Sequence, residues 1–394
     1  MDATVEAYLR LGLRLGRHVD GLVDAYYGPP ELAADIDAEP LVEPARLVED
    51  GDALVAGLED GWLLDQARGL RTYAGVLAGE RLSYSEEVEG CYGIRPRPVD
   101  EAEYAAAHRR LDELLPDGDS LLDRYTRWRE SEAVPDDRIV PLVGEAVELF
   151  RSRAAAIVEL PEGEGLSLEA VRDEPWWAFN YYEGDLRSRV VVNVDVLTTT
   201  DDVVELAAHE VYPGHHTERA VKEQRLVRGR GLLEEAIQLV PTPQSLVAEG
   251  IAETGPGLVL DDGTRDALAD VFEREGLRWD PHRGWEIREA RTPLRRVGLD
   301  VALLLHESGA TASEAQAHHE RWALSTPEQA AQSVRFVTDP TWRAYTITYS
   351  EGRRLCGAYT AGDPARFQRL LTEQVRVGEL VAAADGGTAV SSGA

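Results

Sequence analysis

The sequence predicts a mainly α-helical protein with one small antiparallel β-sheet, and three observations lead to this prediction. Apolar residues recur every three or four positions through much of the chain, which is the period of an amphipathic helix. β-branched and aromatic residues are concentrated in a single short stretch, 176–194, as expected for a small sheet. Proline and glycine punctuate the helical segments at close intervals, which indicates several helices joined by turns.

The length and charge of the chain limit its partners. The 394 residues are enough for one large domain or two packed ones, and 41 basic against 72 acidic residues give a net charge of −31. Such a negative field repels polyphosphates, so nucleic acid is not an expected partner. Apolar runs such as 301–305 are far shorter than the roughly 20 residues that cross a bilayer, so no membrane partner is expected.

The two cysteines, Cys91 and Cys356, cannot build a disulfide framework or a thiolate zinc site. The first 21 residues interleave charges with apolar residues and lack the uninterrupted apolar stretch of a signal peptide. We therefore expect a cytoplasmic protein, whose oligomeric state the sequence leaves open.

The N-terminal part is predicted to be helical. Helices are expected over 5–13, 103–115 and 136–160, and the turn-rich run PEGEG at 161–165 ends the last of them. We place a boundary there, which divides the chain into an N-terminal helical region (1–165), a catalytic region (166–382) and a flexible tail (383–394).

The catalytic region is predicted to begin with a β-hairpin and to continue as helices. The hairpin strands are 176–182 and 189–194, joined by a Glu-Gly-Asp turn. Hydroxyl and carboxylate residues at 198–202 are typical N-cap signals for the helix that follows. Further helices are expected over 232–239, 266–272, 297–305 and 365–381.

The stretch HEVYPGHH at 209–216 lies on the capped helix and holds three of the nine histidines. The zinc helix of a metallopeptidase presents two neutral imidazoles on one face, and a carboxylate beside the first takes a proton from zinc-activated water. His209 and Glu210 match the opening of this pattern. The second ligand usually lies one helical turn further on, but that position is Pro213.

Pro213 should interrupt the helix. It has no N–H for the carbonyl of His209, and its ring clashes with that carbonyl, so the helix must widen or break there. In an unbroken helix His216 would lie about 10.5 Å along the axis from His209, too far to share one zinc ion. We predict His215 as the second ligand, because it requires the smaller distortion, and retain His216 as the alternate ligand.

A third ligand is expected from the sequence Glu249-Gly-Ile-Ala-Glu253. Carboxylates four residues apart share a helix face, so Glu249 could bind zinc while Glu253 accepts the second N–H of a ligating imidazole. Two simpler interpretations stay open on the residues alone. The histidines could interact with a helix C-terminal dipole, and the two glutamates could form a solvated acidic face.

These motifs resemble the bacterial domain-of-unknown-function family 885, whose members resemble gluzincin metallopeptidases. The similarity covers roughly 176–355 and extends to aromatic residues at 181–182, the apolar run 190–193, the segment 300–309 and Tyr349-x-x-Gly352. It implies a multi-helical, gluzincin-like zinc peptidase architecture with a small antiparallel sheet beside the zinc helix.

The resemblance also implies the roles of individual residues. Zinc would be held by two histidines and Glu249, with Glu210 as the general base. Residues 190–194 would form an antiparallel edge strand for an extended peptide, with Val191 and Asn193 as substrate-binding positions.

The transition-state and specificity residues are less closely defined. Tyr349 or His306 would stabilise the oxyanion, with Tyr345 as the next candidate. If a C-terminal residue is removed, Arg353 or Arg343 would meet the free carboxylate. Each of these side chains is equally compatible with a buried, hydrogen-bonded core position.

We therefore predict a zinc-dependent hydrolase, a metallopeptidase of carboxypeptidase or oligopeptidase type that acts on a peptide or small amide. One alternative keeps the zinc site but acts on a non-peptide amide or ester. Another is a non-catalytic, helical metal-binding interaction protein. Glu210 argues against the latter, because a purely structural zinc site is closed by a fourth ligand and has no use for a free base.

Overall fold

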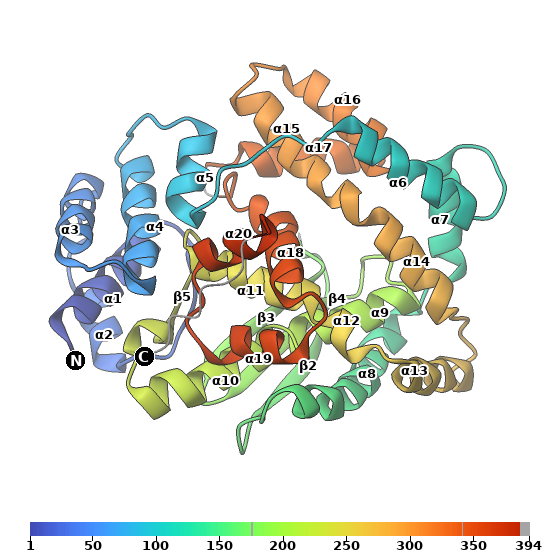
Figure 1. Cartoon of the computed structure of the whole chain (residues 1–394), viewed down its shortest axis with the longest axis horizontal. Helices are drawn as coiled ribbons and strands as arrows, with labels where there is room; N and C mark the ends of the chain where they lie inside the picture. The colour runs from blue at the N-terminus through green and yellow to red at the C-terminus, as the bar shows by residue number, and fades with distance from the viewer. Residues whose placement is uncertain (175, 341, 387–394) are drawn as a thin grey trace.

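The chain folds into many helices around two small sheets, which confirms the predicted mainly α-helical class (Figure 1). The structure is a computed structural model that describes residues 1–174, 176–340 and 342–386. The predicted tail falls largely outside these residues, from 387 onward. Its first residues, Ala383 and Ala384, still belong to the last helix.

The N-terminal part is helical as predicted, with one short strand that the sequence pattern did not indicate. Local capping explains several helix starts: Asp2 accepts hydrogen bonds from the first turn of α1, and Ser83 with Glu86 forms a capping box on α5. The elements are α1 (Ala3–Gly16), β1 (Val23–Tyr26), α2 (Pro30–Ala38), α3 (Pro44–Gly57), α4 (Trp62–Leu77), α5 (Tyr84–Tyr92), α6 (Glu101–Leu114), α7 (Leu121–Ser131) and α8 (Asp136–Ile157).

A three-stranded sheet follows, made of β2 (Gly165–Val171), β3 (Ala178–Gly184) and β4 (Arg187–Asn193) in the order β2-β4-β3. The antiparallel hairpin of β3 and β4 was predicted, and the structure confirms it. The sheet as a whole is mixed, because β2 pairs with β4 in parallel along its full length. The buried side chains of β4, Val190 and Val192, pack in one core with α8 and α9.

The remaining elements run from the candidate zinc helix to the C-terminus. They are α9 (Thr200–Leu206), η1 (Ala207–Val211), α10 (His215–Lys222), η2 (Glu223–Arg228), η3 (Leu233–Ala236), β5 (Ile237–Leu239), α11 (Pro243–Thr254), α12 (Pro256–Val259), α13 (Asp262–Arg274), α14 (Pro281–Arg291), η4 (Thr292–Arg296), α15 (Val297–His306), α16 (Ala312–Ala323), α17 (Pro327–Thr338), α18 (Ile347–Thr360), α19 (Pro364–Thr372) and α20 (Val377–Ala384).

Two helix predictions in this part need correction. The expected helix over 232–239 is the short 3-10 turn η3 followed by β5, because β5 pairs antiparallel with β1, more than 200 positions earlier in the chain. The expected helix over 365–381 is divided into α19 and α20 by the extended residues after Thr372.

Packing crosses the predicted boundary at residue 165. The pairing of β1 with β5 joins the two regions, and helices α1 to α4 share a hydrophobic core with β5. Further on, the buried hydroxyl of Tyr104 donates a hydrogen bond to Asp300 on α15 at 2.8 Å. The first 165 residues therefore pack directly against the elements that follow, rather than being separated from them by a linker.

The crossing of α11 and α18, near the centre of Figure 1, is unusually close. A β-carbon on Gly250 would lie 2.4 Å from the sulfur of Cys356 and 2.5 Å from the carbonyl oxygen of Gly352. A β-carbon on Gly352 would lie 2.6 Å from the carbonyl oxygen of Leu246. Because neither glycine has a side chain, the two helices can approach this closely. The approach brings Glu249 next to the start of α18.

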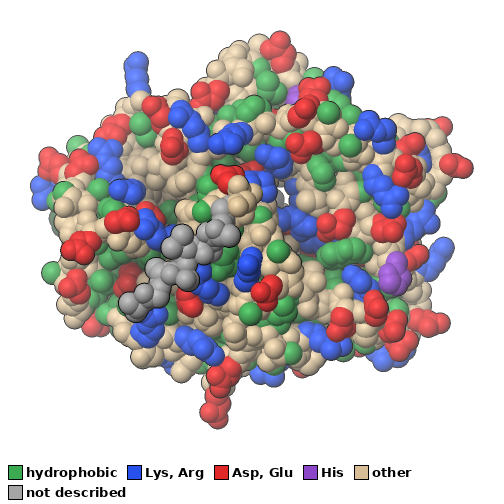
Figure 2. Space-filling view, viewed as in Figure 1, with side chains coloured by type: hydrophobic (Ala, Val, Ile, Leu, Met, Phe, Trp, Pro, Cys, Tyr) green, Lys and Arg blue, Asp and Glu red, His purple; other side chains and the backbone are tan. Residues whose placement is uncertain are grey.

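Acidic and basic side chains are interspersed over the face of the molecule shown in Figure 2. Among the residues that the structure describes, no helix combines the length and the apolar character needed to cross a membrane. The cytoplasmic location stays a prediction.

A buried polar group between η3 and α11 provides a test of the fold. Glu235 is fully buried, and its carboxylate accepts a hydrogen bond from Gln244 at 2.9 Å. Burial raises the pKa of Glu235 to about 7, even though Lys222 opposes the shift. The folded protein therefore keeps this proton between about pH 4.5 and 7, where the unfolded chain releases it.

We expect Glu235→Gln to reduce the pH dependence of stability. In the native protein the stabilising contribution of protonated Glu235 is present below about pH 4.5 and is lost as the pH rises to about 7, on the order of 3 kcal/mol. Urea unfolding at pH 5 and pH 8 should show a smaller loss of stability in the variant. Glu49→Gln, at an exposed glutamate, is the matched control. An equal loss in the native protein and Glu235→Gln would contradict the buried-proton interpretation.

Candidate metal centre

The helix that carries the histidine motif ends where the sequence predicts a break. A capping box between Thr199 and Asp202 starts α9, and the last turn widens into the π-helical η1. Tyr212 is extended, and its N–H still donates to the carbonyl of Ala207 at 3.2 Å. Pro213 has no N–H with which to continue this ladder, so the helix ends at Val211 and α10 begins at His215.

Gly214 allows the chain to fold back over the helix end. Its N–H donates to the carbonyl of Ala208 at 3.0 Å. A β-carbon there would lie 1.8 Å from the carbonyl oxygen of His209, so no other residue fits without moving the backbone. This close approach returns His215 to the neighbourhood of His209.

Three of the predicted ligands, His209, His215 and Glu249, converge. One nitrogen of each histidine and one carboxylate oxygen of Glu249 lie within 4.8 Å of one another. Nε2 of His209 is 3.7 Å from Oε2 of Glu249, and Nε2 of His215 is 3.7 Å from Oε1. Ligands bound at about 2.0–2.1 Å in a tetrahedral site lie roughly 3.3 Å apart, so small side-chain movements would complete the geometry.

The donor set fits a divalent cation chemically. Two imidazole nitrogens and a carboxylate oxygen are ligands that zinc prefers. Oε2 of Glu249 and Nδ1 of His215 are buried, and neither has a hydrogen-bond partner among the described residues. The side chains of the cluster are 9–16% exposed, so they are largely buried but not completely closed off from solvent. A cation would satisfy an otherwise costly buried carboxylate.

Burial and neighbouring charges shift the pKa values of the cluster. Burial raises the pKa of Glu249 to about 7 and lowers the pKa of His215 well below its ordinary value. Burial alone would lower the pKa of His209, but the nearby carboxylates of Glu210 and Glu249 outweigh it and raise that pKa. Three carboxyl groups, those of Glu210, Glu249 and Glu253, therefore lie around His209, and a bound cation would favour their charged forms.

Glu210 lies beside the cluster without belonging to it. Its Oε1 is 4.0 Å from Nε2 of His209, and burial raises the pKa of its carboxyl group. Asn180 on β3 donates from Nδ2 to the backbone carbonyl of Glu210 at 2.6 Å, which anchors this residue to the sheet. The buried guanidinium of Arg219 bonds the carbonyl of Asn180 at 3.1 Å and pairs with Asp24 on β1.

The predicted positioning residue Glu253 lies on the correct side of His209. Its Oε1 is 3.8 Å from Nδ1 of His209, which is longer than a hydrogen bond. Arg295 pairs directly with Oε2 of Glu253, and Arg353 donates to its backbone carbonyl at 3.0 Å. Arg353 also pairs with Glu289 at 2.8 Å, so the arginine proposed for a substrate carboxylate is already engaged by the protein.

Tyr345 and Tyr349 lie next to each other, whereas His306 lies elsewhere in the fold. Tyr345 donates its hydroxyl hydrogen to Oε1 of Glu249 at 2.8 Å, and the ring of Tyr349 lies edge-on to it at 5.4 Å. His306 instead bonds the carbonyl of Val337 at 2.7 Å and stacks on Tyr84. His306 is therefore held by α17 and α5 and does not join the metal cluster.

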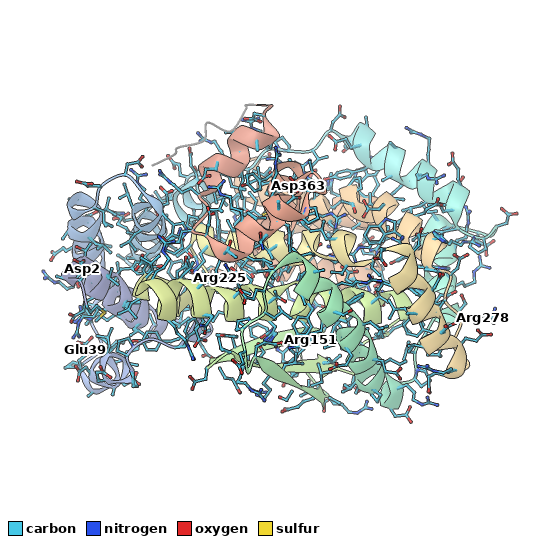
Figure 3. All side chains as sticks on the ribbon, turned by 60° about the horizontal axis from the view of Figure 1, so that its bottom comes forward. Asp2, Glu39, Arg151, Arg225, Arg278 and Asp363 are labelled. Carbon is cyan, nitrogen blue, oxygen red and sulfur yellow. The ribbon has the colours of Figure 1, made fainter. Side chains whose placement is uncertain are left out.

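His216, the alternate ligand, faces away from the cluster. Its Nδ1 is bonded to the hydroxyl of Ser188 at 2.8 Å and its Nε2 to Glu164 at 2.9 Å, so both ring nitrogens are occupied. Tyr212 also bonds Glu164, and so does Arg151, which is labelled on α8 in Figure 3. Burial opposes the charge of Glu164, but the hydrogen bonds from His216 and Tyr212 outweigh it and lower its pKa to about 2.

The predicted substrate strand must be corrected. Residues 187–193 form β4, the central strand of the sheet, and Val191 pairs with both Glu169 on β2 and Phe179 on β3. Its backbone is therefore not available for an added peptide strand. Asn193 is buried, and its side-chain amide donates to two carbonyls of the preceding loop. The strand next to the helix that carries the histidine motif is β3, which lies at an edge of this sheet.

Several contributors to the site were missed by sequence reasoning. Asn180 gave a weak signal, because it is a polar residue inside an aromatic strand. Asp24 and Arg295 gave none, because each lies far along the chain from the residue with which it pairs. Arg219 is close to the histidine motif in sequence, but charged residues are frequent throughout this chain and nothing distinguished it.

Comparison with known proteins gives fold similarity alone. No protein-family model matches the chain, and no curated protein matches it in sequence. A crystal structure of a "putative lipoprotein" from Colwellia psychrerythraea has a TM-score of 0.55 at 14% identity over 90% of this chain. The chain spans 65% of the length of that structure. A second structure is described as a "putative lipoprotein of unknown function" from Shewanella oneidensis. It has a TM-score of 0.48 at 12% identity, and the match covers 89% of this chain and 75% of the Shewanella chain.

Proposed function

We propose that this chain is a zinc-dependent hydrolase, a metallopeptidase-like enzyme acting on a peptide or small amide. The observation that carries the proposal is the convergence of His209, His215 and Glu249. The carboxyl group of Glu210 lies beside them, where it could act as a base. A site with three protein ligands leaves a coordination position for water or substrate. A free base beside it is typical of catalytic rather than structural zinc sites.

The residues of the chain divide the work between them. His209, His215 and Glu249 would hold zinc, which supplies Lewis-acid polarisation of the scissile carbonyl and lowers the pKa of a water molecule. Glu210 accepts a proton from the attacking water and passes it to the leaving group. Tyr345 orients Glu249 through its hydrogen bond, and Tyr349 provides a hydroxyl for the developing oxyanion.

The proposal is tested by metal analysis followed by a peptide-library digest. Purified protein should carry about one equivalent of zinc and should cleave peptide bonds, and Glu210→Gln should lose the cleavage while keeping the metal. Hydrolysis of small amides or esters without peptide cleavage would favour a non-peptide substrate. Zinc without any hydrolysis would favour the non-catalytic metal-binding protein.

The two tyrosines should give different signatures when each is replaced by phenylalanine. Tyr345→Phe removes a hydrogen bond to a ligand and should weaken zinc binding by about 10–100-fold. Tyr349→Phe should keep zinc and lower kcat by about a hundredfold or more with KM little changed. Zinc competition and steady-state kinetics measure the two effects. The reverse pattern would exchange the roles of the two hydroxyl groups.

A further inference from the structure

A cavity is bordered by α7, α9, α12, α13 and α14, which lie together at the right of Figure 1, and none of the three proposed metal ligands lines it. Arginine is the most frequent residue of its lining. The lining arginines are Arg129, Arg265, Arg288, Arg291 and Arg295. Tyrosine and tryptophan rings form much of the remaining wall, and the lining acids are Asp201, Asp202 and Glu205. Five arginines against three acids is unusual in a chain whose net charge is −31.

Three of these arginines already have carboxylate partners. Arg129 pairs with Asp202 at 2.6 Å. Arg288 and Arg295 both pair with Glu205, at 2.5 Å and 2.6 Å. Two of the three lining acids, Asp202 and Glu205, are therefore already paired with these three arginines.

Arg265 and Arg291 have no comparable partner. The nearest carboxylate to Arg265 is the exposed Asp262, at 3.9 Å, and its guanidinium lies over the ring of Trp285. Arg291 forms no ion pair within the described ranges. It lies over the ring of Tyr125 at 4.4 Å, and its Nε is buried without a hydrogen-bond partner.

The remaining acid, Asp201, does not balance these charges. It accepts a hydrogen bond from the indole N–H of Trp279 at 2.8 Å rather than from an arginine. Burial raises its pKa to about 7, so near neutral pH it is charged only part of the time. Stacking on a ring does not replace the hydrogen bonds that the N–H groups of a guanidinium lose when they leave water.

The space in the cavity suits a small ion. About 60 Å³ is open to the centres of water-sized molecules. One such molecule needs about 10–15 Å³, so the cavity has room for roughly four to six non-hydrogen atoms. That is the size of a phosphate ion or of a carboxylate group with a short stem.

We propose that this cavity binds a small oxyanion, either phosphate or a carboxylate, held by the guanidinium groups of Arg265 and Arg291. The planar guanidinium fork donates two parallel hydrogen bonds to an oxyanion, and the anion supplies the missing counter-charge. The inference does not depend on the proposed hydrolase. The cavity does adjoin the metal cluster through the ion pair of Arg295 with Glu253, which lies behind His209.

Calorimetric titration of the metal-free full-length protein tests this site. Inorganic phosphate and acetate are titrated separately, with sodium chloride keeping the ionic strength constant. Saturable binding of one anion per chain is expected. Tighter binding of phosphate would identify a tetrahedral oxyanion as the ligand, and tighter binding of acetate would identify a carboxylate.

Arg291→Gln and Arg265→Gln should each weaken the binding at least tenfold. Arg274→Gln is the matched control, because Arg274 is exposed on α13 and pairs with Glu145 outside the cavity. Circular dichroism checks that the variants fold. If one of the two arginine variants does not fold, the other is sufficient for the test. The proposal is overturned if neither anion binds saturably above chloride, or if the folded arginine variants bind as tightly as the control. Because zinc is absent throughout, the outcome is independent of whether the metal cluster is catalytic.

Discussion

Alanine in place of His215 is expected to leave the purified protein with far less than one equivalent of zinc. The variant keeps only two of the three converging ligands, His209 and Glu249. Losing a partner behind the ligands typically costs 10–100-fold in metal affinity, and losing a ligand itself should cost more than about a hundredfold. His209→Ala and Glu249→Ala should lose zinc in the same way.

His216→Ala is the matched control, because it removes the adjacent histidine from the same turn. Both ring nitrogens of His216 are bonded to Ser188 and Glu164, so neither is free for a metal. This variant should hold close to one equivalent of zinc. All variants are dialysed against a graded series of chelators, and zinc content is compared at each step. Zinc lost from His216→Ala but held by His215→Ala would reverse the ligand assignment.

Glu210→Gln is expected to lower kcat by at least about a hundredfold while zinc content stays at the native level. The substitution keeps the size of the side chain but removes its ability to accept a proton. A hundredfold loss of kcat is the scale expected when a general base is removed. The backbone carbonyl that receives the Asn180 hydrogen bond is unchanged, so the local fold should persist.

Steady-state kinetics and metal analysis on the same preparation separate loss of the base from loss of the metal. Glu169→Gln, an isosteric change at a half-exposed glutamate on β2, is the matched control and should behave as the native protein. Turnover close to the native value in Glu210→Gln would remove this residue from the mechanism, whereas parallel loss of zinc and activity would make it a ligand.

The local features of the site could be predicted from the sequence because they depend on neighbouring residues. The capping residues Thr199 and Asp202 start the helix, and Pro213 with Gly214 ends it. A missing N–H and a missing side chain act on the nearest turn whatever surrounds them. The preference for His215 over His216 follows from the same local geometry, and the observed convergence agrees with it.

The substrate strand could not be placed in this way. The hairpin of β3 and β4 is local and was predicted, but whether β4 lies at an edge depends on a third strand. β2 supplies that strand from before the hairpin, in parallel, and its sequence carries little strand signal because it is half exposed. The prediction that Val191 and Asn193 lie on an edge strand was wrong for this reason.

By itself, the sequence determined the helical class, the hairpin, the interrupted histidine helix and the residue types able to bind zinc. These depend on periodicity, capping and the stereochemistry of proline, all of which act within a few residues. The tertiary structure alone decided which distant side chains share a neighbourhood. It brought Tyr345 to Glu249, engaged Arg353 with Glu289, and kept His306 away from the cluster. Contacts between distant segments follow from how helix and strand surfaces pack, and in a chain with 29% charged residues many pairings are chemically equivalent until the fold selects one.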